Sequence, residues 1–548
     1  MLLASLKVRL QVLKLRRFFY LCIECGNIME QFLRKYPVGI QTFDKVIKGG
    51  YVYIDKTELI FNMVHTGEYY FLSRPRRFGK SLLISTLQAY FEGRKDLFRG
   101  LAIERLETDW EKYPVFRLDF SGNKYTEEGD LLHVANLFLH NYEEIYGAKA
   151  EEQTFGSRFQ GLLRRAMEQT GRQCVVLIDE YDKPLTDTIG NTAMQEKNRE
   201  VLQGLYGVLK NADANIRFAM LTGVTRYGKL GIFSAANNPN DISTAPYFSS
   251  LCGITEDELQ KYFDEDTGRL SIELGVTKGE LLQMLKRKYD GYHFSSRSVD
   301  VYNPFSILNA FKNRQLDNYW FATGTPTYLA LMLKKAGFNP STLEGEIKAS
   351  SETLSSFGSG ENNLVAALYQ SGYLTIKDFD GKFYTLGIPN EEVADGLTSY
   401  LIPEYCNTSM GRFDPEISRL GELITVGDAN GMMEQLQTIM EEIPFENNEP
   451  KMMEAHFRNM VYLMVRATGY KTYVEMPKLG GRIDVCFETD RFAYVIECKR
   501  NLSAKEALAQ IDAKKYAKRL STTGKQLFKI GANFSTGEKN LVEWVVEE

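Results

Sequence analysis

The spacing of apolar residues predicts buried strands that alternate with helices in the N-terminal half. Residues 69–72 and 175–178 are short apolar runs, the pattern of strands buried on both faces of a parallel sheet. Residues 216–226 form a third strand-like run. After the first run, apolar residues recur at helical spacing from Leu82 to Tyr90, which predicts an amphipathic helix. This order favours an α/β fold.

Near the C-terminus, residues 482–500 predict a β-hairpin. Ile483, Val485 and Phe487 alternate with polar or small residues, and residues 494–496 are β-formers. Helix-like segments precede and follow this hairpin, at 454–469 and 504–520.

The hairpin brings charged residues together. If its turn is centred between positions 490 and 491, Asp484 faces Glu497 with Cβ atoms about 5 Å apart. Lys499 projects from the same face as Glu497. Two carboxylates this close repel unless a cation such as Mg²⁺ or Mn²⁺ lies between them. Lys499 could then orient or deprotonate a water. The alternative is a surface hairpin with an ordinary cross-strand ion pair.

The order of these C-terminal elements resembles the PD-(D/E)XK nuclease superfamily. A helix, a Gly-Arg-x-Asp strand, a Glu-x-Lys strand and a Gln-bearing helix follow one another over residues 452–516. The resemblance assigns Asp484 and Glu497 to the metal and Lys499 to the attacking water. It gives supporting roles to Glu454 and Gln510. The proline that usually precedes the Asp is missing here.

The loop between residues 69–72 and the following helix carries phosphate-binding chemistry. It ends in GKS, the last three positions of a P-loop, where the Lys reaches the β/γ-phosphates and the Ser ligates Mg²⁺. Arg74 replaces the first glycine of the full pattern. The residues expected to bind ATP are Arg76, Arg77, Phe78, Gly79, Lys80 and Ser81, with Ser81 also a metal ligand.

Acidic residues follow the second apolar run. Asp179 and Glu180 stand at its end, where the active residues of open α/β sheets lie. We expect Asp179 to hold Mg²⁺ through a coordinated water, and Glu180 to polarise the water that attacks ATP. The alternative is a buried strand with solvated acids at its exit.

Between residues 36 and 329 the chain resembles one family. YPVGIQTFDKV, FLSRPRRFGKSLL, VVLIDEYDKPL, FSAANNPNDIS, VYNPFSIL and YWFATGTPTYL follow one another in this order. The series is similar to the AAA-ATPase-like family that carries a C-terminal PD-(D/E)XK nuclease domain, in which RPRRFGKS is the usual P-loop. The resemblance implies an ATPase joined to a nuclease. It also implies that Thr222 senses the γ-phosphate.

Composition limits the nucleic-acid surface and the number of domains. The chain has 548 residues, too many for one core. Its net charge of −5 gives no global attraction to nucleic acid, so a basic surface must be local. Residues 499–519 carry seven basic and two acidic side chains. They could contact phosphates beside the hairpin, although a solvated helix face explains them equally well.

Cysteine usage and hydropathy indicate a reducing cytoplasm and no membrane span. The seven cysteines suggest no disulfide framework, and Cys22 and Cys25 have no second pair nearby to complete a zinc site. No run of about 18 apolar residues exists. Residues 1–22 contain no acidic residue, and we expect the true start at Met29.

These observations predict an α/β protein with a P-loop AAA-type core, a helical section and a small restriction-endonuclease-like domain. The expected segments are an extension at 1–28, the AAA-ATPase-like core at 29–250, a helical lid or winged-helix-like section at 251–335, a helical connector at 336–440 and the nuclease-like domain at 441–548.

Two functions remain open from the sequence. In the first, ATP binding or hydrolysis controls a nuclease that depends on Mg²⁺ or Mn²⁺, with DNA favoured over RNA and an oligomer possible. In the second, a signalling or remodelling ATPase has a C-terminal domain that binds nucleic acid or protein without cleaving it.

Overall fold

The computed structural model describes most of the chain after residue 33. The described residues are 34–227, 239–321, 329, 332, 343, 347–355, 363–406, 413–442, 450–470, 472–474, 484–501, 503–513, 524–535, 537–538 and 540–548. The predictions for residues 1–28, and for the basic residues at 514–519, lie outside them.

A five-stranded parallel sheet forms the centre of the N-terminal half. In spatial order its strands are β2 (Val115–Asp119), β3 (Cys174–Asp179), β4 (Ile216–Gly223), β1 (Tyr69–Ser73) and β5 (Asn240–Asp241). The three apolar runs therefore form β1, β3 and β4, as predicted. Because β4 lies between β1 and β3, the carboxyl ends of all three meet at one edge of the sheet.

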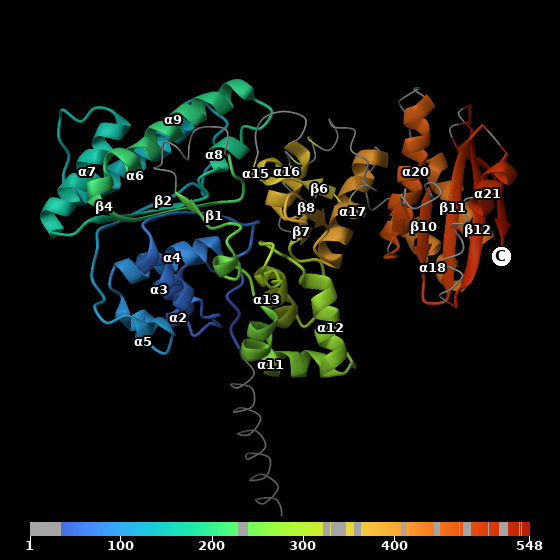
Figure 1. Ribbon diagram of the computed structural model, residues 1–548, viewed down its shortest axis with the longest axis horizontal. Coiled ribbons are helices and arrows are strands. Elements are labelled where there is room, and N and C mark those ends of the chain that lie inside the picture. Colours follow the sequence, from blue (N-terminus) through green and yellow to red (C-terminus); the bar gives the residue numbers. More distant parts are fainter. Residues whose placement is uncertain are drawn as a thin grey trace, which may run out of the picture.

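Helices cover both faces of this sheet, which makes a three-layer α/β structure (Figure 1). One face carries α6 (Asp130–Tyr146), α7 (Phe155–Thr170), α8 (Lys183–Thr186) and α9 (Thr192–Asn211). The other carries α2 (Phe43–Lys48), α3 (Thr57–Thr66), α4 (Lys80–Phe91) and α5 (Ile103–Leu106). Short 3-10 turns lie at Lys95–Phe98, Asp213–Asn215 and Pro246–Phe248.

The described part of the section after the sheet is mainly helical. It contains α11 (Glu256–Glu273), α12 (Lys278–Tyr289) and α13 (Pro304–Asn313), which share a small apolar core. Thr255 caps α11, and its hydroxyl accepts from the Glu258 N–H while the Glu258 carboxylate accepts from the Thr255 N–H.

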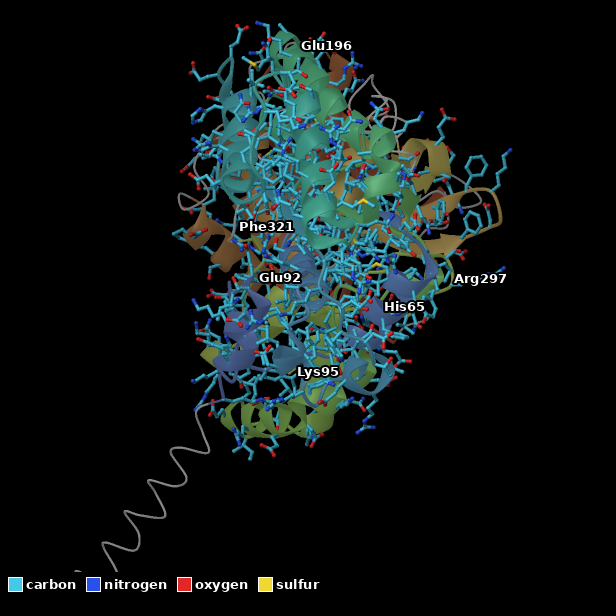
Figure 2. All side chains as sticks on the ribbon, turned by 90° about the vertical axis from the view of Figure 1, so that its left-hand side faces the viewer. His65, Glu92, Lys95, Glu196, Arg297 and Phe321 are labelled. Atoms are coloured by element: carbon cyan, nitrogen blue, oxygen red, sulfur yellow. The ribbon has the colours of Figure 1, made fainter. Side chains whose placement is uncertain are left out.

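Charged side chains such as Glu196 and Arg297 lie at the periphery of the molecule (Figure 2).

The connector is not wholly helical, so the prediction for 336–440 is wrong in this respect. Besides α15 (Ser351–Ser355), α16 (Asn363–Ser371) and α17 (Glu391–Cys406), it contains an antiparallel sheet of β6 (Ile347–Ala349), β8 (Tyr384–Gly387) and β7 (Thr375–Phe379). The β7–β8 turn runs from Asp380 to Phe383, where the Asp380 N–H donates to the Phe383 carbonyl at 3.2 Å and Gly381 has a φ of 94°. Asp-Gly between β-forming runs is a strong hairpin signal that the helical prediction overlooked.

The C-terminal unit is a second five-stranded sheet with helices against it. Its strand order is β13 (Asn540–Glu547), β12 (Gln526–Ser535), β11 (Phe492–Arg500), β10 (Val485–Glu488) and β9 (Thr472–Val474). Its helices are α18 (Asp414–Val426), α19 (Ala429–Glu441), α20 (Pro450–Ala467) and α21 (Ala504–Ala513). α19 packs on β13, where the Gln437 amide donates to the Leu541 carbonyl at 2.6 Å. The unit therefore includes α18 and α19, ahead of the expected boundary at 441.

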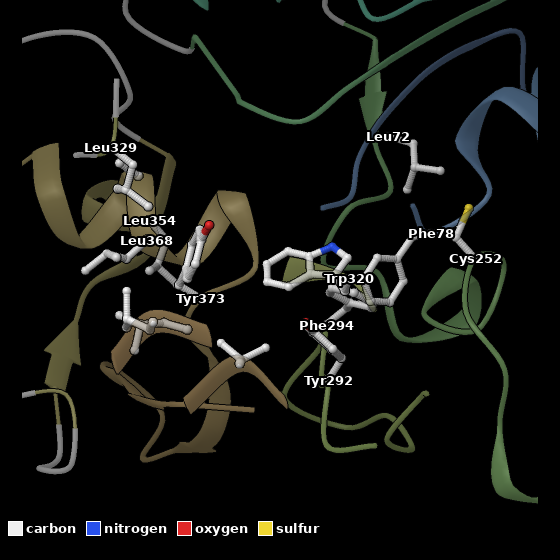
Figure 3. Packing of buried hydrophobic residues seen from close by; sticks show 14 of the residues in the cluster. Leu72, Phe78, Cys252, Tyr292, Phe294, Trp320, Leu329, Leu354, Leu368 and Tyr373 are labelled. Atoms are coloured by element: carbon white, nitrogen blue, oxygen red, sulfur yellow. The ribbon is translucent and has the colours of Figure 1, made fainter. Parts of the chain in front are cut away.

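One continuous apolar cluster joins the parallel sheet, the connector and the C-terminal sheet. Figure 3 shows Trp320 in the middle of its central part, with Phe78, Phe294 and Tyr373 around it. The three regions are thus packed on one another. Among the described residues, no helix combines the length and apolar character needed to cross a membrane.

Candidate functional sites

The loop between β1 and α4 has the backbone shape of a phosphate-binding turn. It runs from Arg74 to Gly79, and α4 begins at Lys80. Gly79 has a φ of 94°, in the region where a residue without Cβ is favoured. The free N–H groups and the positive end of the α4 dipole therefore face the end of the loop.

Arg74 anchors this loop to the rest of the molecule. Its side chain is buried, and its guanidinium donates to the carbonyls of Ser243 at 2.7 Å and Ser73 at 2.9 Å. The guanidinium carbon also lies 4.1 Å from the centroid of the Phe294 ring. The arginine that replaces the first glycine of the P-loop pattern thus has a structural role.

Lys80 is buried at the start of α4 and held by the loop itself. Its Nζ donates to the carbonyls of Arg74 at 2.9 Å and Pro75 at 3.0 Å. Burial lowers the pKa of the Lys80 ammonium, and attraction to the carboxylates of Glu180 and Asp179 opposes this. The predicted lysine and acids are therefore brought together.

Asp179 lies at the carboxyl end of β3 and is fully buried. Its Oδ1 accepts from the Thr222 hydroxyl at 2.7 Å and from the Glu180 N–H at 3.2 Å. Among the described residues, nothing donates to its Oδ2. A buried carboxylate oxygen without a donor is suited to a water coordinated by a cation, so the Asp179 site fits Mg²⁺.

Glu180 sits where its carboxylate can act on a water. Its backbone φ is 51°, an uncommon left-handed conformation that turns the chain at the end of β3. Burial raises the pKa of Glu180; Lys80 opposes this rise and Asp182 adds to it. Glu180 also lines the cleft described below.

Asp182 has a structural role that sequence reasoning did not assign. It is buried and accepts from the Thr225 N–H at 2.6 Å, the Thr225 hydroxyl at 2.5 Å and the Val224 N–H at 3.2 Å. A Cβ at Gly223 would lie only 2.5 Å from Asp182 Oδ1. Asp182 therefore fixes the chain after β4, and with it Thr222, to the chain after β3.

A cleft of about 360 Å³ opens beside the loop. The predicted residues that line it are Arg76, Arg77, Gly79, Lys80, Ser81 and Glu180. Its walls are completed by residues 37–41, Leu82, Ser121, Lys183, Pro304, Phe305 and Leu308. A smaller apolar pocket of about 100 Å³ adjoins it near Gly79. Residues 37–41, Pro304, Phe305 and Leu308 lie within the YPVGIQTFDKV and VYNPFSIL segments of the family resemblance. Because these segments are distant in sequence, their meeting at the cleft follows from the tertiary fold and not from a local pattern.

Among the predicted loop residues, Phe78 does not line this cleft. Arg77 does line it, and its guanidinium lies 5.1 Å from the centroid of the Phe305 ring. The Phe78 ring is buried, with centroids 4.8 Å from Tyr292 and 5.4 Å from Phe294 (Figure 3). A contribution of Phe78 to phosphate binding would therefore come from its backbone.

The C-terminal hairpin has the predicted register. Val485 pairs with Ile496, which places Asp484 opposite Glu497. The Cys498 N–H donates to Asp484 Oδ2 at 2.8 Å, and Lys499 Nζ lies 3.2 Å from Glu497 Oε1. All three predicted side chains are thus gathered at one end of the hairpin.

Asp484 carries the electrostatic signature of two facing acids. Burial raises its pKa to about 6, and repulsion from Glu497 adds to the rise. An ordinary ion pair would instead lower the pKa of Asp484. Among the described residues no cluster of three His, Cys, Asp or Glu exists, so waters or backbone oxygens would complete a metal site here. Two carboxylates are sufficient for Mg²⁺, which retains several waters.

Arg458 is a neighbour of this site that sequence reasoning missed. It projects from α20, and its guanidinium Nη1 lies 4.0 Å from Asp484 Oδ1. Its position four residues after Glu454 puts the two on one helix face, which was the available signal. The side chain of Glu454 lies outside the described residues. Gln510 is half-buried on α21, which packs on β11 and β12.

Comparison with known proteins identifies the two domains that carry these candidate sites. A family model described as a predicted AAA-ATPase matches residues 37–233, and a PD-(D/E)XK nuclease superfamily model matches residues 452–544. A protein of Azotobacter chroococcum mcd 1, described as an uncharacterized protein in the vnfD 5′ region, is 34% identical over 527 residues, covering 94% of this chain and 99% of that protein. The chain therefore belongs to the same family as the Azotobacter protein, and it joins an AAA-ATPase-like domain to a C-terminal PD-(D/E)XK nuclease superfamily domain.

Proposed function

We propose that this protein binds and hydrolyses ATP, and that ATP controls a divalent-metal-dependent nuclease that acts on DNA in preference to RNA. The observation that carries the nuclease part is the pairing of Asp484 with Glu497. Both carboxylates are nearly buried and repel each other, an arrangement that costs folding energy unless a cation is bound.

In the first site, the loop and α4 would bind the phosphates through backbone N–H groups. Lys80 would exchange the carbonyls of Arg74 and Pro75 for the β/γ-phosphates. Ser81 and Asp179 would hold Mg²⁺, which supplies charge neutralisation for phosphoryl transfer.

Two side chains of this site would then recognise the γ-phosphate and promote its hydrolysis. Glu180 would polarise the attacking water, and its raised pKa makes it a stronger base than an exposed carboxylate. Thr222, fixed to Asp179, would sense the γ-phosphate. The apolar pocket beside Gly79 suits the adenine ring.

In the second site, Asp484 and Glu497 would hold a divalent cation, which supplies Lewis-acid stabilisation of the scissile phosphate. Lys499 would orient the attacking water, since its ammonium lies beside Glu497. Arg458 would offset the negative charge that develops on the phosphate.

Calorimetric titration of the full chain tests whether two separate sites exist. ATP in the presence of Mg²⁺ should bind wild type, and Lys80→Ala should lose this binding. Mn²⁺ without nucleotide should bind wild type at the second site, and Asp484→Asn should lose it. Loss of both ligands in either variant, or no binding of ATP or Mn²⁺ to wild type, would contradict the proposal.

A further inference from the structure

The phosphate-binding loop touches the middle of the chain at two points. The Trp320 indole N–H donates to the backbone carbonyl of Arg76 at 3.1 Å. Gly372, in the turn between α16 and β7, lies against Pro75 so closely that a Cβ there would be 2.7 Å from the Pro75 Cβ. The backbone of the loop therefore cannot change shape without affecting these residues.

Trp320 is in turn fixed to the first turn of α17. Its backbone N–H donates to Glu392 Oε1 at 2.7 Å, and the Ser306 hydroxyl of α13 donates to Glu392 Oε2 at 2.7 Å. Glu392 is fully buried, and the Trp320 and Tyr373 ring centroids lie 5.3 Å apart (Figure 3). Both oxygens of a buried carboxylate are thus used to tie Trp320 to two helices.

From α17 the contacts continue to the C-terminal site. α17 packs along α20, and Arg466 on α20 lies 4.0 Å from Asp395 on α17. Farther along α20, Arg458 lies 4.0 Å from Asp484. A contiguous series of contacts therefore joins the carbonyl of Arg76 to the carboxylate pair at the hairpin.

We propose that Trp320 and Glu392 are positioning residues that link nucleotide binding at the loop to the nuclease site through α17 and α20. This inference rests on the proposed function. When Lys80 moves from the carbonyls of Arg74 and Pro75 to phosphate, the loop backbone between them and Gly79 must adjust. The buried indole N–H has to follow the Arg76 carbonyl, because an unpaired buried donor is costly.

The emission of Trp320 provides a direct readout that needs no nucleic acid. The chain has three tryptophans, so a Trp110→Phe/Trp544→Phe double variant leaves Trp320 as the only emitter. A saturable change in its emission on titration with Mg²⁺ and a non-hydrolysable ATP analogue is expected. If calorimetry shows that the double variant binds the analogue while the emission stays constant, the linkage is overturned.

Two matched pairs of variants test the consequence for the nuclease. Trp320→Phe keeps an aromatic ring but loses the N–H that donates to the Arg76 carbonyl. Its control is Trp110→Phe, which makes the same change at an indole whose N–H donates to the backbone carbonyl of Glu107. Glu392→Gln weakens the buried hydrogen bonds from the Trp320 N–H and the Ser306 hydroxyl. Its control is Glu391→Gln, which alters the neighbouring, half-exposed ion-pair partner of Arg287.

Trp320→Phe should bind ATP about two- to tenfold more weakly, the range for one lost hydrogen bond. Trp320→Phe and Glu392→Gln should also cleave at a rate that no longer depends on ATP, while both control variants behave as wild type. The linkage is overturned if either test variant keeps the full response to ATP. If wild type binds no ATP or cleaves no substrate, the proposed function is wrong, and the proposed linkage is then wrong as well.

Discussion

Replacing Asp484 by Asn should stabilise the metal-free protein at neutral pH. The burial and the neighbouring Glu497 that raise the pKa of Asp484 from 3.8 to about 6 also make its ionised form unfavourable in the folded state. Asn has nearly the same shape, and its carbonyl can still accept from the Cys498 N–H. The substitution therefore removes the charge and leaves the local geometry in place.

The size of the effect follows from the pKa shift. Because one pKa unit corresponds to about 1.4 kcal/mol, the shift of Asp484 costs the ionised form roughly 3 kcal/mol of unfolding free energy. Because the pKa of Asp484 is raised in the folded state, the stability associated with its protonated form is complete below about pH 4. This stability is lost as the pH rises through about 6. Asp484→Asn should thus be more stable than wild type at about pH 7.5, by up to about 3 kcal/mol, and nearly equal to it at about pH 4.

Urea unfolding in the presence of a chelator measures this difference. In a Trp110→Phe/Trp320→Phe background, emission comes from Trp544 on β13 and reports on the C-terminal sheet. Asp490→Asn, an exposed position in the same hairpin turn, is the control and should change stability by less than about 0.5 kcal/mol. Excess Mn²⁺ should then stabilise wild type but not Asp484→Asn. A destabilised Asp484→Asn variant at neutral pH without metal would refute the reasoning.

Further predictions concern both sites and the buried Glu392. Lys80→Ala should abolish ATP binding in calorimetry with nearly unchanged melting temperature, whereas the exposed Lys95→Ala should bind normally; equal ATP affinity of Lys80→Ala and wild type would contradict the assignment. Glu180→Gln should bind ATP but lose phosphate release, and a wild-type rate of release would place water activation elsewhere. Arg458→Gln should reduce the slope of log DNA affinity against log salt concentration, measured in Ca²⁺, by about 0.7–0.9, which corresponds to the loss of one phosphate contact. Arg491→Gln, at the opposite end of the hairpin, should leave the slope unchanged. Identical slopes for Arg458→Gln and wild type would mean that Arg458 serves only as a counterion of Asp484. Burial raises the pKa of Glu392 to about 7, so the stability associated with its neutral form is complete below about pH 4.5 and lost as the pH rises through 7. Glu392→Gln should therefore flatten the fall in melting temperature between about pH 5 and pH 8, and an unchanged profile would count against this.

Local patterns predicted the parts of both sites that local structure decides. The alternation within residues 482–500 and the position of the turn were enough to place Asp484 opposite Glu497, because a hairpin register follows from its turn. The apolar runs likewise identified β1, β3 and β4, whose carboxyl ends carry the GKS loop, Asp179 and Thr222. Each of these features depends on residues close in sequence or on the geometry of a parallel sheet.

Contacts between distant segments could not be predicted in this way. Trp320 and Arg76 are separated by 244 positions, and their hydrogen bond depends on how the connector packs on the loop. The same applies to the hydrogen bonds between Asp182 and Thr225, because the two residues are far apart in sequence and meet only when β3 and β4 pair. The β7–β8 hairpin is different, because the Asp380-Gly381 dipeptide that begins its turn is a local signal, although the segment was predicted to be helical.

Cleavage of a panel of DNA and RNA substrates tests the central claim most directly. The full chain is assayed with Mn²⁺ or Mg²⁺, with and without ATP, beside Lys80→Ala and Asp484→Asn. The account predicts metal-dependent cleavage by wild type at a rate that ATP changes, an ATP-independent rate for Lys80→Ala and no cleavage by Asp484→Asn. Cleavage by Asp484→Asn at the wild-type rate would contradict the proposed site. An absence of cleavage on every substrate, with ATP and metal both bound, would contradict the nuclease function and favour a C-terminal domain that only binds.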